Sequence, residues 1–330
     1  MFAGQRILIT GGTGSWGREL ARQLLDRSPE EIIVYSRNES GQVAMDRELR
    51  DSRVSYRIGD VRDRKALTQA CKGVDLIFHL AALKHVPVCE NHPYEALKTN
   101  VLGTQNVIEA ALENGVKKVV NVSSDKAASP SGFYGMTKAI GEKLIVYANL
   151  LDGNTKFISV RGGNVLGTAG SVLSLFMNQI AKGEPIGITH PAMTRFFLTL
   201  ADTVRFLIGA ASEGEGGEIY VMKAPACRIA DLAEVLMEEA GKRVDVVETG
   251  VRPGEKLHET LLTEQESATA IAYDDRYLIL LPTIDIPGLK PRYSGFAGIG
   301  SGGIRSDRPT IGKADIRRLL ERGGLLSRPG

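Results

Sequence analysis

Two residues whose types and spacing could do chemistry together stand in the run Tyr134-Gly135-Met136-Thr137-Lys138. Residues four apart lie on one face of a helix, so a helix here would bring the phenol and the amine together. A nearby ammonium stabilises the phenolate and lowers the pKa of a tyrosine. We therefore predict that Tyr134 acts as a base near neutral pH and that Lys138 assists it.

A second pattern joins an apolar run to a helical one, and it reads Thr10-Gly11-Gly12-Thr13-Gly14-Ser15-Trp16-Gly17. The spacing Gly11-x-x-Gly14-x-x-Gly17 is typical of dinucleotide sites, where the glycines serve a tight turn, the approach of the pyrophosphate and the packing of helix on strand. The pyrophosphate would lie at a helix N-terminus, whose free N–H groups and dipole favour anions. The alternative is an ordinary glycine-rich turn. The residues expected to bind the cofactor here are Gly11, Thr13, Gly14, Ser15, Trp16 and Gly17.

The end of the second expected strand bears on which dinucleotide is bound. NAD sites place an acidic residue there for the ribose 2′-hydroxyl, whereas this chain has Ser36 and Arg37. A guanidinium can pair with a 2′-phosphate, so NADP is favoured over NAD. The alternative for Arg37 is a solvated cation beside Glu39. Four residues after the third and fourth strands are placed to contact the adenine or to lie along the cofactor: Asp60, Val61, Ala81 and Ala82.

These groups must be positioned by elements that the hydrophobic pattern predicts over residues 1–165. Strands are expected at 6–10, 31–36, 54–59, 76–80, 118–123 and 157–161, and helices at 14–25, 93–113 and 133–150. The strands are apolar without a period of two, which indicates a parallel sheet covered on both faces. We predict an α/β protein with a Rossmann-type doubly wound parallel sheet.

The pattern loosens after residue 161. Helices at 174–182, 200–211 and 229–240 and strands at 218–221 and 244–248 predict a smaller α/β lobe over 166–283, some segments of which return to the first domain. Residues 284–330 are rich in glycine, so we expect a flexible C-terminal arm with a short helix near 314–322.

Composition excludes several classes of protein. Glycine makes up 37 of 330 residues, or about 11% against about 7% in ordinary proteins, but without the three-residue period of collagen. The net charge is +2, and so small an excess of positive charge does not indicate a nucleic-acid-binding protein. The absence of long apolar runs and of a signal peptide leads us to expect a cytoplasmic protein. The cysteines and histidines show neither disulfide nor metal-ligand spacing, so no metal is expected.

Together these motifs resemble the extended short-chain dehydrogenase/reductase superfamily. Further runs resemble the bacterial UDP-N-acetylglucosamine 4,6-dehydratases over roughly residues 5 to 283. They are Ser123-Ser124-Asp125-Lys126-Ala127, Ala81-Ala82-Leu83-Lys84-His85-Val86-Pro87, Lys98-Thr99-Asn100, Met193-Thr194-Arg195-Phe196 and Arg252-Pro253-Gly254-Glu255-Lys256-Leu257-His258-Glu259. The resemblance adds Lys84, Asn100, Ser123, Tyr134 and Lys138 to the expected cofactor contacts.

The resemblance also implies catalytic roles. Tyr134 would take the C4-hydroxyl proton, with Ser124 bonded to the C4 oxygen. Lys126 would remove the C5 proton and Asp125 would protonate the departing C6 hydroxyl. Because a lysine base must be neutral when it acts, we expect burial or the neighbouring Lys138 to lower the pKa of Lys126. The presence of Lys126, where glucose dehydratases have Glu, favours an N-acetylhexosamine substrate, and Tyr134 favours inversion at C5.

The same resemblance implies a UDP-sugar site and a homo-oligomer, dimeric or hexameric. Leu175 and Met193 could instead be core residues, and Arg252 a surface cation. The family often has Tyr where Gly162 stands, and usually Thr at the position of Ser124. The expected substrate contacts are Lys84, Asn164, Ser171, Leu175, Thr189, Met193, Arg195, Arg252 and Glu255.

Three other functions stay open at this point. A C4 epimerase needs the tyrosine and the cofactor but no C5 base, so Asp125 and Lys126 argue against it. A 5-retaining dehydratase would use the same residues. A regulator that binds NADP without turnover is disfavoured by the intact Ser124, Tyr134 and Lys138.

Overall fold

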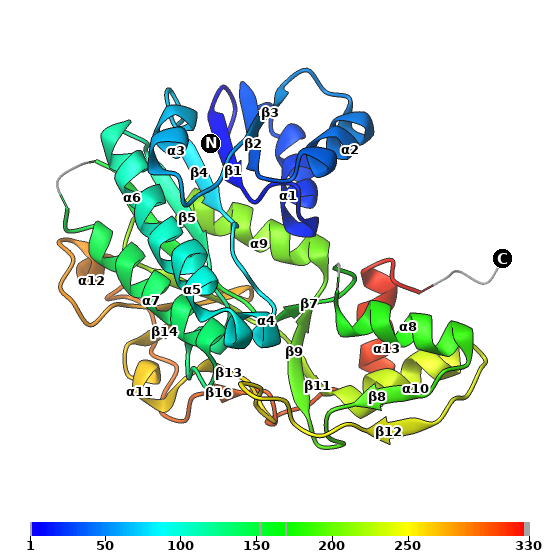
Figure 1. The fold of residues 1–330 in the computed structure, drawn as a ribbon. Coiled ribbons are helices and arrows are strands. Elements are labelled where there is room, and N and C mark those ends of the chain that lie inside the picture. The colour runs from blue at the N-terminus through cyan, green and yellow to red at the C-terminus, as the bar shows by residue number, and fades with distance from the viewer. Residues whose placement is uncertain (1, 152–153, 169, 327–330) are drawn as a thin grey trace.

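A large sheet forms the centre of the protein in the computed structural model, which describes residues 2–151, 154–168 and 170–326. In those ranges the sheet has nine strands in the order β14-β15-β10-β6-β5-β4-β1-β2-β3. Strands β4, β1, β2 and β3 can be followed side by side in Figure 1. The strands from β10 to β3 run parallel, and β15 pairs antiparallel with both of its neighbours, β10 and β14. Their bounds are β1 Arg6–Thr10, β2 Glu31–Ser36, β3 Val54–Ile58, β4 Leu76–His79, β5 Lys118–Val122, β6 Lys156–Arg161, β10 Ile219–Met222, β14 Ala270–Ala272 and β15 Tyr277–Leu280.

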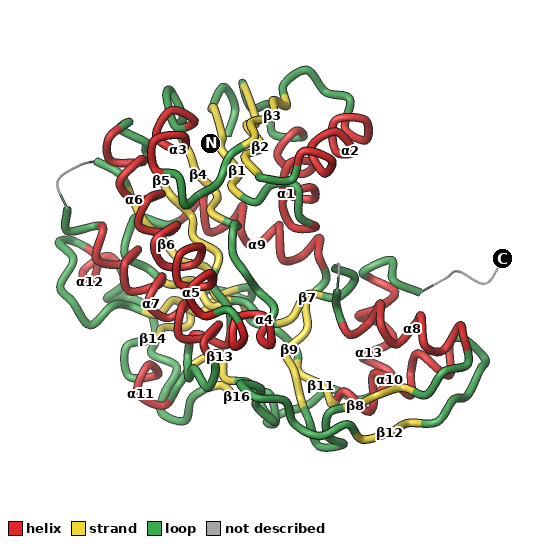
Figure 2. Tube along the Cα trace, viewed as in Figure 1, coloured by secondary structure: helices red, strands yellow, loops and turns green. Residues whose placement is uncertain are grey.

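Helices cover both faces of this sheet (Figure 2). Leu20, Leu24 and Leu207 belong to the apolar core on one face, and Leu67, Val107 and Ile145 to the core on the other. The first face carries α1 Ser15–Leu25, α2 Glu39–Leu49 and α9 Leu200–Glu213; the second carries α3 Arg64–Ala70, α6 Gly103–Glu113 and α7 Phe133–Ala148. The predicted doubly wound fold is confirmed, and the six strands expected before residue 165 all form.

The helix expected over 93–113 is interrupted. It consists of α5 Pro93–Ala96, a π-helical stretch Leu97–Leu102 and α6, and it is preceded by α4 Val86–Asn91. Our reading of the sequence did not include α2 and α3. Both begin with an aspartate or asparagine cap: Asn38 accepts from the Gly41 N–H, and Asp63 from the Ala66 N–H.

Among the described residues, the lobe is built from two small sheets and three helices, with an apolar core of its own that includes Phe176, Leu236 and Leu320. One sheet has the order β11-β9-β7, and the other pairs β12 with β8. Their bounds are β7 Asn164–Val165, β8 Ile186–Ile188, β9 Thr194–Leu198, β11 Ala226–Arg228 and β12 Val246–Glu248, with helices α8 Val172–Lys182, α10 Ile229–Glu239 and α13 Lys313–Arg322.

The chain passes between the two parts more than once after residue 165. Residues 200–222 and 270–280 supply α9, β10, β14 and β15 to the large sheet, so the predicted lobe of 166–283 is not one continuous unit in space.

The stretch 284–326 differs from the flexible arm that we expected. Leu289 and Tyr293 are buried in the core of the large sheet, while Leu319 and Leu320 are buried in the core of the lobe. The remaining elements are β13 Thr260–Leu262, α11 Glu264–Ser267, α12 Leu289–Arg292 and β16 Ile304–Arg305, with β16 paired to β13. Glycine abundance was misleading because apolar residues between the glycines pack this segment on both parts.

In the part of the chain that the structure describes, no helix has the length and apolar character to cross a bilayer. Within the same ranges, no cluster of three or more histidine, cysteine, aspartate or glutamate side chains is arranged to hold a metal ion.

Candidate active site

The predicted site residues meet in a cavity of about 640 Å³ at the carboxyl ends of the parallel strands. The order of the strands reverses on the two sides of β1, and ligands of doubly wound sheets bind outside such a switch point. The loops after β1, β2, β3 and β4 line one end of the cavity, and those after β5 and β6, with residues of the lobe, line the other.

The three motif glycines have different surroundings. Gly11 has a φ of +67°, and a Cβ there would lie 2.9 Å from the backbone nitrogen of Ala81. A Cβ on Gly17 would lie 2.2 Å from the Gly12 carbonyl oxygen, so helix and turn could not pack together. A Cβ on Gly14, the N-cap of α1, would lie no closer than 3.4 Å to another atom, the Gly11 carbonyl oxygen, and Gly14 borders the cavity. Gly11 and Gly17 are therefore required by the turn itself, whereas Gly14 leaves room for a ligand at the helix N-terminus.

Most of the other expected cofactor contacts also line the cavity: Ser15, Trp16, Ser36, Arg37, Asp60, Val61, Ala81, Ala82, Lys84 and Ser123. Arg37 is half-exposed, and its Nη1 lies 3.4 Å from Asp60 Oδ2. The Ser123 hydroxyl is buried and has no hydrogen-bond partner among the described residues, so it is available to a ligand.

Two residues of the expected cofactor set do not line the cavity. The Thr13 hydroxyl lies 2.8 Å from the Ser36 hydroxyl. Asn100 is buried, and its side-chain oxygen accepts from the Leu83 N–H at 2.8 Å while its amide donates to the Leu83 carbonyl at 2.9 Å. Both support the cavity wall from behind.

Tyr134 and Lys138 lie on α7, which starts where the Glu90 carboxylate accepts the Phe133 N–H. The Lys138 amine donates to the Val122 carbonyl at the end of β5. Burial lowers the pKa of Lys138 to about 8 and raises that of Tyr134 to about 12. Our expectation of a lowered tyrosine pKa is therefore not met, because burial outweighs the nearby cation. That cation is Lys126, which lowers the pKa of Tyr134 in part.

Ser124, Asp125 and Lys126 follow β5 in a 3-10 turn. Asp125 Oδ1 accepts from the Ser124 hydroxyl at 3.0 Å and from Lys126 Nζ at 3.0 Å. Asp125 is 1% exposed, and its Oδ2 has no hydrogen-bond partner in the described chain. Burial raises the pKa of Asp125 despite the opposing effect of Lys126, so this carboxyl is suited to carry a proton.

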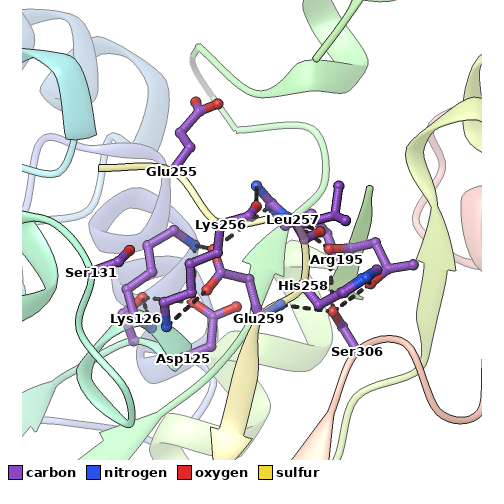
Figure 3. Close-up of polar contacts among 12 residues, drawn as sticks. Asp125, Lys126, Ser131, Arg195, Glu255, Lys256, Leu257, His258, Glu259 and Ser306 are labelled. Carbon is purple, nitrogen blue, oxygen red and sulfur yellow. Dashed lines mark hydrogen bonds and ion pairs between the residues drawn. The ribbon is translucent and has the colours of Figure 1, made fainter. Parts of the chain in front are cut away.

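Glu259 is the second carboxylate beside Lys126, with Oε1 at 3.1 Å from Nζ (Figure 3). Burial by itself lowers the pKa of Lys126. The two carboxylates, Asp125 and Glu259, raise it by more than burial lowers it, so the net shift of the pKa is upward. This corrects our expectation of a lowered lysine pKa. The resemblance brought Glu259 into a quoted motif without a role, and no spacing rule connects positions 126 and 259.

The lobe side of the cavity contains fewer of the expected substrate contacts. Asn164 and Ser171 line it with Lys84, and Asn164 Oδ1 is buried without a partner in the described residues. Six expected contacts lie outside the lining: Leu175, Thr189, Met193, Arg195, Arg252 and Glu255.

Those six occupy different environments. Met193 is buried in the core of the lobe, which fits the alternative interpretation given above. Arg195 is buried, and its guanidinium donates to the carbonyls of Leu257 and Lys256 at 3.2 and 3.0 Å. Leu175 and Arg252 are exposed, and Thr189 and Glu255 are half-buried. In this structure Arg195 therefore holds the segment that carries Glu259.

Gly162, where the resemblance led us to expect tyrosine, faces Met222. A Cβ on Gly162 would lie 3.0 Å from the Met222 sulfur, so Met222 occupies the space beside this position. The next residue, Gly163, is required by close packing, because a Cβ there would lie 2.6 Å from Phe196 Cβ.

The doubly wound sheet, the glycine turn and the Ser124, Tyr134 and Lys138 side chains at one cavity define an extended short-chain dehydrogenase/reductase. Within that class, the chain belongs to the family described as "Polysaccharide biosynthesis protein", whose model matches residues 7–280.

Similar proteins carry two different activity names. A UDP-N-acetylglucosamine 4,6-dehydratase (inverting) of Campylobacter jejuni is 43% identical over 283 residues, covering 84% of each chain. A UDP-glucose 4-epimerase of Rickettsia canadensis is 41% identical over 292 residues, covering 87% of this chain and 86% of the relative. The crystal structure of Pen from Bacillus thuringiensis is 39% identical, with a TM-score of 0.92 and 99% of each chain covered. That last likeness therefore extends over the C-terminal stretch.

Proposed function

We propose that this protein is a UDP-N-acetylglucosamine 4,6-dehydratase that inverts C5. The product would be a UDP-2-acetamido-2,6-dideoxy-4-keto-hexose for the synthesis of surface polysaccharide or flagellin glycan. The observation that carries the proposal is the contact of Asp125 with Lys126 at the cavity, beside Ser124 and Tyr134. Elimination of water requires an acid and a base besides the oxidation apparatus, and these two side chains supply them.

The cofactor in this proposal is NADP. The cavity fits a dinucleotide because Gly14, the N-cap of α1, has no side chain to cap the helix and leaves space at its N-terminus. When bound, the nicotinamide supplies hydride acceptance and return. Ser36 and Arg37 would hold the 2′-phosphate, and Lys138 would hold the nicotinamide ribose.

The residues of the chain then handle the protons. Tyr134 accepts the proton of the C4 hydroxyl in its phenolate form, while the Ser124 hydroxyl bonds to the C4 oxygen. Formation of the C4 ketone acidifies C5–H, which Lys126 removes as Asp125 protonates the C6 hydroxyl that leaves as water. Since Lys126 Nζ and Asp125 Oδ1 are 3.0 Å apart, the proton that the lysine must lose can be the one that the aspartate must gain. In the elimination the lysine takes up the C5 proton and the aspartic acid gives its proton to the departing water, so the pair ends as it began.

A C4 epimerase is the second candidate, favoured by the name of the Rickettsia relative at nearly the same identity. It would use Tyr134 and the cofactor in the same way, but it leaves Asp125 and Lys126 without a task. A 5-retaining dehydratase differs only in the face of C5 that is reprotonated.

The experiment is incubation of the full chain with UDP-N-acetylglucosamine and NADP in deuterated water, followed by proton NMR. The proposal expects a new C6 methyl signal, and the ring couplings of the product with deuterium at C5 should show inversion. Conversion of the sugar without that methyl signal would overturn the dehydratase. A C4-inverted hexosamine as the product would establish the epimerase instead, and no conversion at all would support a non-catalytic binding protein. Light scattering on the same sample tests the homo-oligomer that we propose.

A further inference from the structure

The surroundings of Glu259 set it apart from other carboxylates near the cavity. Its side chain is 2% exposed, and it is approached by cations from three segments. Lys126 Nζ lies 3.1 Å from Oε1, Arg195 Nε from β9 lies 3.7 Å from the same atom, and Lys256 Nζ lies 3.8 Å from Oε2. A buried carboxylate beside several cations remains ionised, because protonating it would leave those cations without a counter-charge.

The backbone of Glu259 is held as firmly as its side chain. Its N–H donates to the Ser306 hydroxyl at 2.9 Å, and its carbonyl accepts the Ser306 N–H at 2.9 Å. Figure 3 shows the side chain of Glu259 pointing from this anchor toward Lys126 and Asp125. The carboxylate is therefore fixed by the fold and approaches the lysine from outside the cavity, because Glu259 is not among the lining residues.

We propose that Glu259 is a positioning residue, which anchors the Lys126 amine through this ion pair and thereby sets the pH at which that lysine works. The catalytic part of this inference rests on the proposed function, because a base at C5 is needed only for dehydration. The charged and titratable groups that face Lys126 are Asp125 on its own turn, Glu259, Arg195, Lys256 and, from α7, Tyr134.

The sign of the effect follows from the charges. Asp125 and Glu259 favour the ammonium, and Arg195 opposes it. Removing the charge of Glu259 while keeping its shape leaves Lys126 with one carboxylate instead of two. The Lys126 amine then loses its proton at lower pH, so a larger fraction of it is neutral at a given pH. Without the ion pair to Glu259, the amine is also less firmly positioned.

The first test measures the amine without turnover. Full-length protein is labelled with trace acetic anhydride at pH 8, and peptide mass spectrometry gives acetylation of Lys126 relative to the exposed Lys143. Only the neutral amine reacts, so Glu259→Gln should raise this ratio by about tenfold, as a pKa lower by about one unit requires. Glu259→Asp keeps the negative charge, so its ratio of Lys126 to Lys143 acetylation should stay closer to that of the parent. An unchanged ratio in Glu259→Gln would overturn the proposal.

The matched control is Glu266→Gln. Glu266 is also paired with a buried cation, Arg161, at 2.9 Å, but it lies outside the cavity. Loss of that ion pair should lower the melting temperature and leave the labelling of Lys126 unchanged. A rise in Lys126 labelling as large as that of Glu259→Gln would show general loosening and contradict the positioning role.

The second test uses the pH dependence of kcat/KM for formation of the C6 methyl product. Glu259→Gln should move the acidic limb of the profile to lower pH by about one unit and lower kcat by about tenfold. In Glu259→Asp the acidic limb should lie close to its position in the parent. A limb that stays in place, despite altered labelling, would refute the claim that Glu259 sets the working pH. If the parent protein forms no methyl product, the proposed function fails, whereas the labelling result still decides whether Glu259 controls Lys126.

Discussion

The hydroxyl of Ser306 accepts the backbone N–H of Glu259 at 2.9 Å and lies 2.6 Å from the Thr194 hydroxyl. Ser306 belongs to the C-terminal stretch, Thr194 begins β9 in the lobe, and Glu259 precedes β13. All three residues are buried. One hydroxyl therefore joins three distant segments next to the lysine that we propose as the C5 base.

Replacing Ser306 by alanine should cost both stability and activity. The buried N–H of Glu259 would lose its acceptor, at a cost of about 1–3 kcal/mol. Urea unfolding should show that loss, and turnover should fall while the affinity for the dinucleotide stays near that of the parent. The exposed Ser301 provides the control, because Ser301→Ala should leave both quantities unchanged. Parent-like stability and turnover in Ser306→Ala would contradict this role.

The glycine turn offers a pair of substitutions with opposite consequences. Gly17→Ala places a Cβ against the Gly12 carbonyl, so we expect a lower melting temperature in the absence of ligand. Gly14→Ala meets no such obstacle, and it should fold normally but bind dinucleotide at least tenfold more weakly. The sole tryptophan of the sequence, Trp16, lines the cavity, so its fluorescence reports the titration. Equal melting temperatures for the two variants would argue against the steric assignment.

Arg37 should discriminate between the two dinucleotides. If its guanidinium pairs with the 2′-phosphate, Arg37→Ala should weaken NADP by about tenfold, as expected for loss of a charge-assisted contact, and weaken NAD much less. Titration of Trp16 fluorescence with each dinucleotide measures the two losses. Equal losses, or parent protein that prefers NAD, would show that Arg37 is the solvated cation of the alternative interpretation.

Lys126→Ala should separate oxidation from elimination. Tyr134, Ser124 and Lys138 are intact in this variant, so oxidation at C4 can proceed while C5–H is not removed. We expect loss of the C6 methyl product, with NADPH absorbance accumulating to at most one equivalent. Lys143→Ala, on the exposed side of α7, is the control. Dehydration at the parent rate in Lys126→Ala would remove this lysine from the mechanism.

Lys138 makes stability depend on pH. Burial lowers its pKa from 10.5 to about 8, so between these values the unfolded chain binds more protons and stability rises with pH. Below pH 8 the amine is charged in both states, and the folded protein bears the full cost of burying it. Lys138→Met should therefore be more stable than the parent by about 1–3 kcal/mol at pH 7.

That advantage of Lys138→Met should shrink as pH rises from 8 to 10.5, where the parent amine becomes neutral in both states. Urea unfolding of parent and variant at several pH values gives the difference. Lys143→Met, exposed on the same helix, should show no such trend. A constant difference between parent and Lys138→Met would mean that Lys138 is not the group responsible.

Much of the cofactor half was predictable because its signals are local. The strand expected at 31–36 forms over those residues, and the glycine turn lies where an apolar strand meets a helix. The spacing of Tyr134 and Lys138 placed them on one helix because helical periodicity depends only on positions within a few turns. The short strands of the lobe were largely missed, since pieces such as β8 and β11 hold too few residues to show a period.

The sequence by itself determined which groups are available: a glycine turn for a phosphate, a tyrosine and a lysine on one helix, and an acid beside an amine after β5. Only the tertiary structure decided the pKa values of these groups. It placed Glu259 and Ser306 from distant segments beside Lys126, which reversed the expected direction of the lysine pKa, and it buried Tyr134 enough to raise its pKa. The physical reason is that a pKa depends on desolvation and on charges within a few ångströms, and chain folding alone brings those charges together.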